Sequence, residues 1–341
     1  MNHLIIYHSE DNDGVCSCAL IEDWLKKTTI LDEYGQSNVY RLPSNYASLA
    51  KLVEENDFDD YFGKYDYVWM TDVSFNDWHY MKRLYDMFGE RFIWMDHHAP
   101  IIKDSEEHGF SKANGFRDTG RSAILCAYHY LYDQRDADYN TGEVPSILRL
   151  LSAWDCWAWT KEGLDEKFIR SFNTGVSVFS ELSVDWYLDR MDTLLLPGSH
   201  EENYGYPLDS NDSVRSSISE YVNLGGQIID RQDKANEALV LGYGEEGWSV
   251  DGEKNAIMIV TSGPTNSQMF KSVADKFEHG VVFKHSKEGK WLVSLYNTRN
   301  DITFDCGAYL KKKYNGGGHI GAAGCTLNDT EFFKVLWEKN L

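Results

Sequence analysis

Three short apolar runs near the start of the chain each end at an aspartate or a histidine. The runs and the residues that follow them are Leu4–Tyr7 with His8, Tyr67–Met70 with Thr71 and Asp72, and Phe92–Met95 with Asp96, His97 and His98. Apolar runs of this length are typical of strands buried on both faces. In an open α/β sheet, ligands bind at the carboxyl ends of the strands. The pattern therefore predicts an α/β fold in which separate loops build one polar site.

Helical patterns separate these runs along the first half of the chain. Strands are expected at 3–8, 39–42, 66–71 and 91–95, and helices at 15–27, 46–56, 77–88 and 120–132. Residues 145–159 and 163–195 are predicted to be helical as well. Strands and helices that alternate at these lengths indicate a parallel sheet with helices on both faces.

The pattern changes after residue 195. Residues 197–213 are rich in Gly, Asn, Asp and Ser and predict a surface loop, and residues 214–238 predict a connecting helix. Strands are then expected at 256–261, 280–284 and 291–296, ahead of a final helix. We therefore expect a first domain at 1–195, a loop and connecting helix at 196–238, and a smaller α/β domain at 239–341, with a cleft between the two domains.

The charge balance limits the kind of ligand that the chain can bind. Its 341 residues include 33 Lys and Arg against 54 Asp and Glu, which gives a net charge of −21. Long duplex nucleic acid is disfavoured as a partner, because its binding needs many cations that neutralise phosphates. A short nucleotide bound beside metal ions is compatible with this charge, since the ions supply the positive charge locally.

The cysteines and the apolar runs predict the cellular location. The six cysteines lie at 16, 18, 126, 156, 306 and 325, without the paired spacing of a zinc site, and are expected to be buried thiols in a reducing cytosol. The N-terminus lacks the basic and apolar segments of a signal peptide. No apolar run approaches the roughly 20 residues of a membrane span. We expect a cytoplasmic protein with no membrane partner.

Six carboxylate and imidazole side chains are candidate metal ligands. They are His8, Asp11, Asp13, Asp72, His97 and Asp155. Taken singly, Asp11 and Asp13 also suit a turn and Asp72 suits a helix cap, but their convergence at strand ends favours a metal site. The mixed nitrogen and oxygen set suits Mn²⁺, Mg²⁺ or Zn²⁺ and favours Mn²⁺. Two ions that share a carboxylate would lie about 3.5–4 Å apart and activate water against a phosphoryl group.

The glycine run Gly316-Gly317-Gly318 is followed by His319. Successive glycines allow backbone N–H groups to form a nest for an anion, and a helix that starts after them would add its dipole. His319 could then hydrogen-bond a phosphate or a base. A flexible turn before the last helix explains the run equally well, so both interpretations stay open.

Taken in order, these motifs resemble the DHH phosphoesterase superfamily with its DHH-associated C-terminal domain. The residues that carry the resemblance are His8-Ser9-Glu10-Asp11-Asn12-Asp13-Gly14, Asp72, Asp96-His97-His98, Ser152-Ala153-Trp154-Asp155, Ser294-Leu295-Tyr296-Asn297, Gly316-Gly317-Gly318-His319 and Ala322-Ala323-Gly324. They extend over nearly the whole chain. The chain is most similar to the nanoRNase or cyclic-nucleotide phosphodiesterase branch, because it is short and lacks the additional nucleic-acid domains of RecJ-type exonucleases.

The resemblance implies a metal-binding catalytic domain at 1–195 that holds two Mn²⁺ ions, with Mg²⁺ as the alternative. One ion would be held by His8, Asp11 and Asp72. The other would be held by Asp13, Asp72, His97 and Asp155, so that Asp72 bridges the two. The catalytic residues would be Asp72 and His98, with His98 facing the substrate phosphate and Asp96 orienting the histidine pair.

The resemblance also implies a substrate-binding domain at 239–341. The substrate-binding residues would be His98, Arg299, Gly316, Gly317, Gly318 and His319. Two positions depart from the family pattern. Two residues separate His8 from Asp11 where related branches have one or three, which leaves open whether Glu10 or Asp11 is the ligand. An arginine is often expected at the position of Tyr296, and a tyrosine there could stack on a base.

The predicted function is a Mn²⁺-dependent phosphodiesterase that hydrolyses short oligonucleotides, dinucleotides or cyclic nucleotides to mononucleotides. A phosphomonoesterase or pyrophosphatase acting on small nucleotides is one alternative, and a non-catalytic nucleotide-binding protein is another. A homodimer is also an open alternative. The aromatic residues Trp78, Tyr80, Tyr85, Trp186 and Tyr187 either line its interface or belong to helix cores, and their helical context favours the cores.

Overall fold

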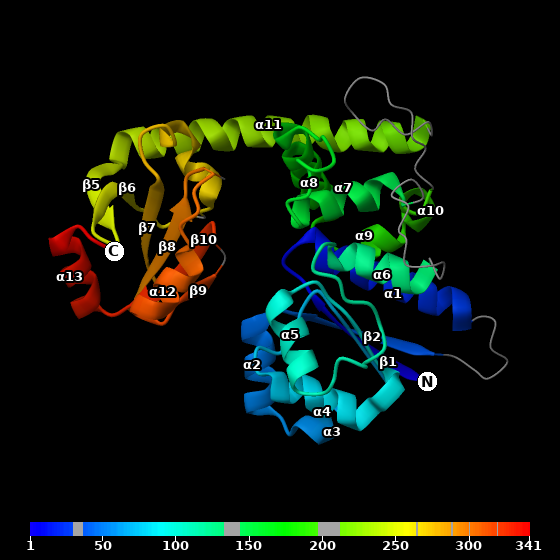
Figure 1. Cartoon of the computed structure of the whole chain (residues 1–341). Coiled ribbons are helices and arrows are strands. Elements are labelled where there is room, and N and C mark those ends of the chain that lie inside the picture. Colours follow the sequence, from blue (N-terminus) through cyan, green and yellow to red (C-terminus); the bar gives the residue numbers. More distant parts are fainter. Residues whose placement is uncertain are drawn as a thin grey trace. The chain divides into compact units, whose positions relative to one another are not determined.

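The computed structural model of the chain describes residues 1–29, 37–132, 144–196, 212–263, 265–287, 289–299, 301–318 and 320–341. His319 and most of the loop expected at 197–213 lie outside these residues. The chain separates into two compact units, Met1–Ile228 and Ile229–Leu341, each with its own sheet (Figure 1).

The first unit contains a four-stranded parallel sheet with the strand order β2-β1-β3-β4. Its strands are β1 (Asn2–His8), β2 (Asn38–Ser44), β3 (Tyr67–Thr71) and β4 (Phe92–Met95). The register pairs Tyr7 with Thr71, and Thr71 with Met95. Because these three residues lie side by side in neighbouring strands, the residues after them reach the same edge of the sheet. The register therefore brings His8, Asp72 and Asp96 to one place.

Helices cover both faces of this sheet, as the sequence predicted (Figure 1). The helices are α1 (Asn12–Thr29), α2 (Tyr46–Glu55), α3 (Phe58–Phe62), α4 (Trp78–Phe88), α5 (Ala99–Glu107), α6 (Ala123–Tyr132), α7 (Ser146–Asp155), α8 (Glu166–Ser180), α9 (Val184–Leu188) and α10 (Met191–Leu194). A 3₁₀ turn, η1 (Gly89–Arg91), precedes β4. The predicted helix at 145–159 ends earlier than expected, at Asp155, and the short α3 and α5 were not anticipated.

Alternating residues of each strand enter two separate cores. Ile5 and Tyr7 pack with α1 and α6 to α10 on one face, whereas Leu4 and Ile6 pack with α2 to α5 on the other. This alternation follows from the two-residue period of a strand. A strand that is apolar on both faces needs two layers of helices, which explains why the apolar runs show no alternation with polar residues.

The aromatic residues considered for a dimer interface belong to these cores. Tyr187 is fully buried, and the other four pack partly buried against the two clusters. The expectation that they are core residues is confirmed. All six cysteines are free thiols, and five of them are buried.

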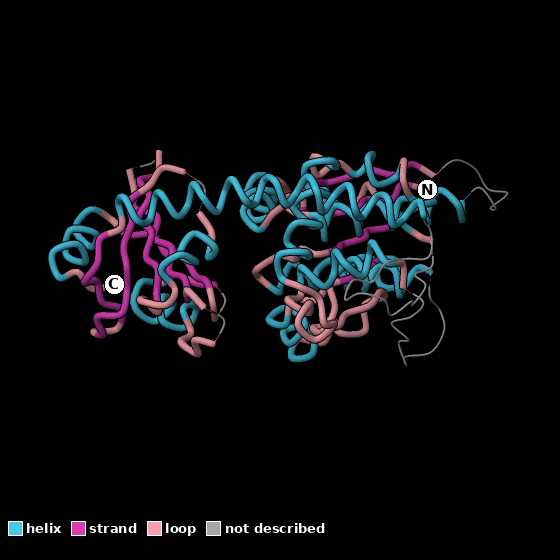
Figure 2. Tube along the Cα trace, turned by 90° about the horizontal axis from the view of Figure 1, so that it is seen from above, coloured by secondary structure: helices cyan, strands magenta, loops and turns pink. Residues whose placement is uncertain are grey.

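The long helix α11 (Asp212–Tyr243) extends the predicted connecting helix at both ends. Figure 2 shows it as one uninterrupted helix. The boundary between the two compact units falls inside it, after Ile228. None of the helices in the described part of the chain is both long enough and apolar enough to span a membrane.

The second unit contains a six-stranded sheet with the order β5-β6-β7-β8-β10-β9. Its strands are β5 (Glu245–Val250), β6 (Glu253–Val260), β7 (His279–His285), β8 (Trp291–Asn297), β9 (Gly317–Gly318) and β10 (Ala322–Leu327). Only β6 and β7 pair in parallel, and the other pairs are antiparallel. One face carries α12 (Cys306–Tyr314) and α13 (Asp329–Glu338), and the other carries the end of α11 and the 3₁₀ segment η2 (Ser267–Val273). A smaller α/β domain was expected here.

The segment after the glycine run is a correction to the sequence analysis. A helix was expected to start there, but Ala322–Leu327 forms the strand β10 and pairs with Gly317–Gly318. The residues Ala322, Ala323, Gly324 and Cys325 are small, and small residues allow the close approach of a neighbouring strand. The glycines therefore enter a sheet and do not cap a helix.

Candidate metal centre

A tight turn joins β1 to α1 and places the first acidic motif. Gly14 lies in the first turn of α1, where a Cβ atom would come within 2.1 Å of the His8 carbonyl oxygen. Only glycine therefore allows the helix to pass this close to the end of the strand. The backbone N–H of Gly14 donates to Asp11 Oδ1 at 3.0 Å, which orients that carboxylate toward His8.

One cluster of candidate ligands contains His8, Asp11 and Asp72. Nδ1 of His8 lies 2.8 Å from Asp11 Oδ2 and 3.6 Å from Asp72 Oδ2. Hydrogen bonds with Asp11 and Asp72 raise the pKa of His8 to about 10, against the opposing effect of burial. The two carboxylates thus attract positive charge to this place, which a proton on His8 or a metal ion can supply.

A second cluster surrounds Nε2 of His97. This atom lies 3.7 Å from Asp13 Oδ2, 3.3 Å from Asp72 Oδ1 and 3.4 Å from Asp155 Oδ2. The three carboxylates come from α1, from the end of β3 and from the end of α7. Asp72 therefore contributes one oxygen to each cluster.

The N-terminus of α6 holds Asp13 in place. The backbone N–H groups of Ala123 and Ile124 donate to the two oxygens of Asp13, each at 2.8 Å. A helix N-terminus stabilises a negative charge through its free amides and its dipole. The start of α6, next to the helix start predicted at residues 120–122, thus positions Asp13 from outside the candidate ligand cluster.

The electrostatics of the cluster fit a bound cation. Burial raises the pKa of Asp72 and Asp155 well above the usual range, and the nearby charge of Asp13 adds to the effect. Burial also raises the pKa of Asp13. Asp155 Oδ2 is buried without a hydrogen-bond partner. Buried carboxylates that repel one another are stabilised by metal ions, so the residues present fit the predicted ligand set.

Asp96 positions His98. The fully buried Asp96 accepts hydrogen bonds from the backbone N–H of His97 at 2.7 Å and of His98 at 3.0 Å, and its Oδ1 lies 2.7 Å from Nδ1 of His98. Trp94 Nε1 donates to the second oxygen of Asp96 at 3.0 Å. Asp96 therefore holds both backbone amides of the pair but only the ring of His98. The ring of His97 faces Cys156, whose Sγ lies 4.0 Å from its Nδ1.

Glu10 and Asp11 occupy different surroundings. The side chain of Glu10 is 61% exposed, accepts a hydrogen bond from Asn45 and lies 3.9 Å from His8 Nε2. Asp11 contacts His8 directly and belongs to the cluster with Asp72. This geometry favours Asp11 over Glu10 as a ligand.

Asn12 anchors the turn between the two motif aspartates. Its side-chain amide donates to Asn173 Oδ1 at 2.9 Å and to Ser177 Oγ at 2.8 Å, and its Oδ1 accepts from the Tyr187 hydroxyl at 2.8 Å. These partners belong to α8 and α9. The buried network ties the loop that carries Asp11 and Asp13 to helices more than 160 residues away in sequence.

The predicted residues of the second unit have mainly local contacts. Arg299 donates to Asp301 Oδ1 at 3.1 Å and to the carbonyl oxygen of Ala274. A Cβ on Gly316 would come within 2.4 Å of the Gly324 carbonyl oxygen, whereas Gly317 is exposed and has open space around it. Tyr296 is 9% exposed and packs in the core with Phe270, so the predicted stacking on a base is wrong.

Sequence reasoning missed three residues near the cluster. Cys156 and Trp157 follow Asp155 directly, and Tyr46 lies with its ring 6.2 Å from that of His98 in an edge-to-face arrangement. Neither Cys156 nor Trp157 was assigned to the site from the sequence. The position of Tyr46 depends on the pairing of β2 with β1, which the local pattern does not contain.

A known relative and several solved structures are similar to this chain. No family model matches the chain. The oligoribonuclease NrnB of Bacillus subtilis (strain 168) is 23% identical over 334 residues, which cover 96% of this chain and 73% of the relative. The solved DHH domain of a member of the S1p family of ribosomal proteins has a TM-score of 0.55 at 13% identity, over 99% of this chain and 85% of the other. The pGpG-specific phosphodiesterase PggH of Vibrio cholerae has a TM-score of 0.49 at 12% identity, over 99% and 97% of the two chains.

The fold, the motif residues and the relative point to one family. The parallel sheet matches that of a DHH domain, and the Asp96-His97-His98 motif stands at the edge of this sheet beside the clustered carboxylates. The similarity to NrnB extends over nearly the whole chain. Together these findings support the resemblance to the DHH phosphoesterase superfamily that the sequence motifs indicate, with the fold of a DHH domain and an oligoribonuclease as a relative over nearly the whole chain.

Proposed function

We propose that this enzyme is a two-metal phosphodiesterase that cleaves short oligonucleotides or dinucleotides to mononucleotides, with Mn²⁺ as its metal. The observation that carries the proposal is the position of Asp72. Its Oδ2 faces His8 and its Oδ1 faces His97, so one carboxylate joins two adjacent clusters of ligands. A shared carboxylate of this kind is typical of two-metal phosphoesterase sites.

The ligand assignment follows from the two clusters. His8, Asp11 and Asp72 would hold one ion, and Asp13, Asp72, His97 and Asp155 would hold the other. Ions held there would supply the Lewis acidity that polarises a phosphoryl oxygen and activates water. Nitrogen and carboxylate ligands together favour Mn²⁺, with Mg²⁺ as the alternative.

His98 is proposed to bind the substrate phosphate. Burial lowers the pKa of His98, but the hydrogen bond and the charge of Asp96 outweigh this effect, so that the pKa is raised. Asp96 faces Nδ1 of the ring, which leaves Nε2 as the nitrogen that can donate to a phosphate oxygen. Asp96 thereby orients His98 and favours its charged form.

The substrate class is supported by the relative and by the charge of the chain. NrnB, whose similarity covers 96% of this chain, is an oligoribonuclease. A net charge of −21 opposes the binding of long polyanions, whereas a short substrate can be held by two cations and a few contacts. Gly316, Gly317, Gly318, Arg299 and His319 are proposed contacts for the remainder of the substrate. The six free cysteines support a cytoplasmic site of action.

The decisive experiment is a hydrolysis panel with Mn²⁺. The substrates are pApA, pGpG, a five-nucleotide RNA, cyclic dinucleotides, cyclic AMP, a nucleoside bisphosphate and pyrophosphate, and chromatography identifies the products. We expect mononucleotides from the short linear substrates. Hydrolysis of cyclic substrates alone would assign the enzyme to cyclic nucleotides. Hydrolysis of pyrophosphate or of the bisphosphate alone would replace the proposal by a phosphomonoesterase or pyrophosphatase. Bound Mn²⁺ without any turnover would contradict the enzyme proposal.

A further inference from the structure

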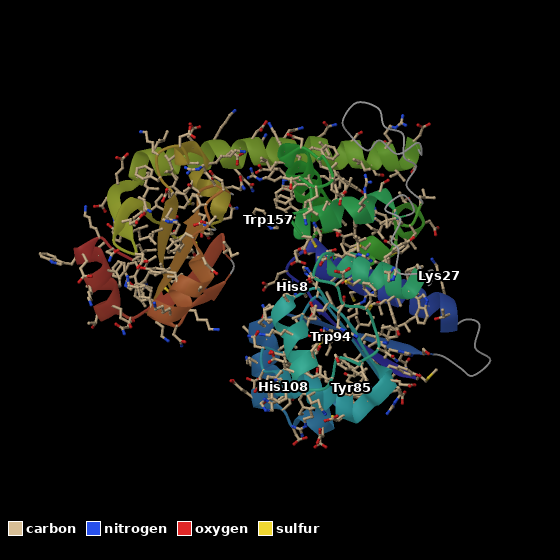
Figure 3. The ribbon with its side chains drawn as sticks, in the orientation of Figure 1. His8, Lys27, Tyr85, Trp94, His108 and Trp157 are labelled. Carbon is tan, nitrogen blue, oxygen red and sulfur yellow. The ribbon has the colours of Figure 1, made fainter. Side chains whose placement is uncertain are left out.

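Trp157 stands in an unusual position beside the metal centre. It follows Asp155 and Cys156 at the end of α7, where its backbone has a φ of +55° and its surface is 56% exposed. Figure 3 labels it at the end of this helix. Its backbone N–H donates to the Trp154 carbonyl, and that of Ala158 donates to the Ala153 carbonyl, which completes the helix end. Glycine is the usual residue after a helix that ends in this way.

Stability alone does not explain a tryptophan here. A residue other than glycine in the left-handed region costs on the order of 1–2 kcal/mol. Burial of a side chain could offset this cost, but more than half of Trp157 remains exposed. Backbone strain of this kind gathers at functional sites, where the side chain has a role besides packing.

The ring of Trp157 is supported from behind by other aromatic side chains. Its centroid lies 5.0 Å from that of Trp159, which is only 4% exposed. Trp159 in turn stacks on Trp154 at 5.6 Å with an interplanar angle of 19°. This support fixes the orientation of the exposed Trp157 ring. Less side-chain entropy is therefore lost when another ring stacks on it.

The location links this ring to the metal centre. Asp155 Oδ2 lies 3.4 Å from His97 Nε2, and Cys156 Sγ lies 4.0 Å from His97 Nδ1. The exposed large apolar side chains among the described residues of the first unit are Met1, Tyr40, Trp157 and Val178. Of these, only Trp157 lies within two residues of a proposed ligand. It therefore stands at the rim of the site.

We propose that Trp157 is a stacking platform for a nucleobase next to the phosphate that is cleaved. The inference rests on the proposed phosphodiesterase function and specifies how the substrate is recognised. An exposed aromatic face stacks on any base, and each such contact contributes about 1–3 kcal/mol. The platform thus selects nucleotides over phosphoesters without a base, and it discriminates little between different bases.

The test compares Trp157→Gly, Trp157→Phe and the wild type on pApA and on an analogue of pApA that lacks its bases. Trp157→Gly should raise KM for pApA by roughly 5- to 150-fold and leave kcat within a few-fold. The KM of Trp157→Phe for pApA should lie between that of the wild type and that of Trp157→Gly. The melting temperature of Trp157→Gly should stay the same or rise, because glycine relieves the positive φ. All three proteins should cleave the base-free analogue equally well.

The control is Tyr40→Ala, which removes another exposed aromatic residue of the first unit. Tyr40 pairs with Leu4, four residues before the strand ends at His8, which is roughly 13 Å from the metal centre. KM for pApA should not change in this variant. An unchanged KM in Trp157→Gly, or an equal loss on pApA and on the base-free analogue, would overturn the platform and leave the phosphodiesterase proposal intact.

A wild type that cleaves neither the dinucleotides nor the five-nucleotide RNA would refute the proposed function, and the platform is then tested by binding. AMP in the presence of Mn²⁺ is titrated against tryptophan fluorescence of the wild type and of Trp157→Phe. Quenching that is weaker in Trp157→Phe supports stacking on this ring. Equal quenching in both proteins contradicts it.

Discussion

Asp72 Oδ1 lies 3.3 Å from Nε2 of His97, although the two residues follow different strands of the sheet. The in-register pairing of β3 with β4 brings them together, and Asp72 adopts a φ of +57° as its strand ends. Aspartate and asparagine are among the few residues that tolerate this backbone conformation. The conformation turns one carboxylate toward both clusters, and this geometry is the basis of the proposed bridging role.

Replacing Asp72 by asparagine should abolish the bridge while preserving the backbone. Asparagine tolerates the positive φ, and loss of a buried negative charge removes repulsion from Asp13. We expect kcat on pApA to fall on the order of 10²–10³-fold or more, with a melting temperature in chelator that is unchanged or higher. Steady-state kinetics and thermal melting measure both effects. Asp192→Asn, an exposed aspartate on α10, is the control and should change neither. Substantial Mn²⁺-dependent turnover by Asp72→Asn would rule out the bridge.

Addition of Mn²⁺ should stabilise the enzyme against heat. The ion neutralises buried carboxylates, including Asp155 Oδ2, which has no hydrogen-bond partner. Binding only to the folded state adds about 2.7 kcal/mol at a free concentration 100 times Kd. Calorimetry in Mn²⁺, compared with chelator at matched ionic strength, should show a higher melting temperature. The increase should be much smaller in Asp155→Asn. A variant that responds to Mn²⁺ as strongly as the wild type would show that Asp155 is not a ligand.

Substitutions at two neighbouring glycines can distinguish a structural role of the glycine run from a role in substrate binding. Gly318 has a φ of +144°, and a Cβ there would lie 2.5 Å from the Cα of Ala323. Gly318→Ala should therefore destabilise the second unit by roughly 1–3 kcal/mol, measured by urea unfolding. Gly317 has no atom within 4 Å of its Cβ position, so Gly317→Ala should retain stability. If the glycine run contacts substrate, Gly317→Ala raises KM for pApA. An unchanged KM would restrict the run to pairing with β10.

A buried histidine predicts how stability depends on pH. His3 is 4% exposed and its Nδ1 accepts a hydrogen bond from Trp69 Nε1 at 3.2 Å. Burial, with a smaller effect of the N-terminal charge, lowers the pKa of His3 below its ordinary value of about 6.5. As the pH falls below about 6.5, the unfolded chain binds a proton before the folded one, so stability decreases until the folded pKa is passed.

The variant His3→Asn tests this prediction, because its side-chain oxygen can replace Nδ1 as the acceptor and does not titrate. The free energy of unfolding in chelator should fall less steeply in this variant than in the wild type between about pH 7 and pH 5. Above about pH 7.5 the two curves should run parallel. The same slope in both proteins throughout the range would show that His3 does not titrate differently on folding.

Local patterns contained most of the secondary structure of the first unit. The apolar runs of β1, β3 and β4 differ from helices in their short length, and the turn around Asp11 and Asp13 is evident from its composition. The same reasoning failed for the segment after Gly318. The pairing of strand β10 with β8 is a long-range contact that no local period reveals. The end of α7 at Asp155 was also missed, because the aromatic residues after it continue an apolar pattern.

The sequence by itself indicated the residue types of the candidate metal centre and determined the alternation of strands and helices, because both depend on chemistry and periodicity over a few residues. Only the tertiary structure decided which oxygen of Asp72 faces which histidine, that Asp11 lies closer to His8 than Glu10 does, and that Trp157 is exposed beside the cluster. These relations depend on strand register and on burial. Both arise from contacts between residues that are far apart along the chain.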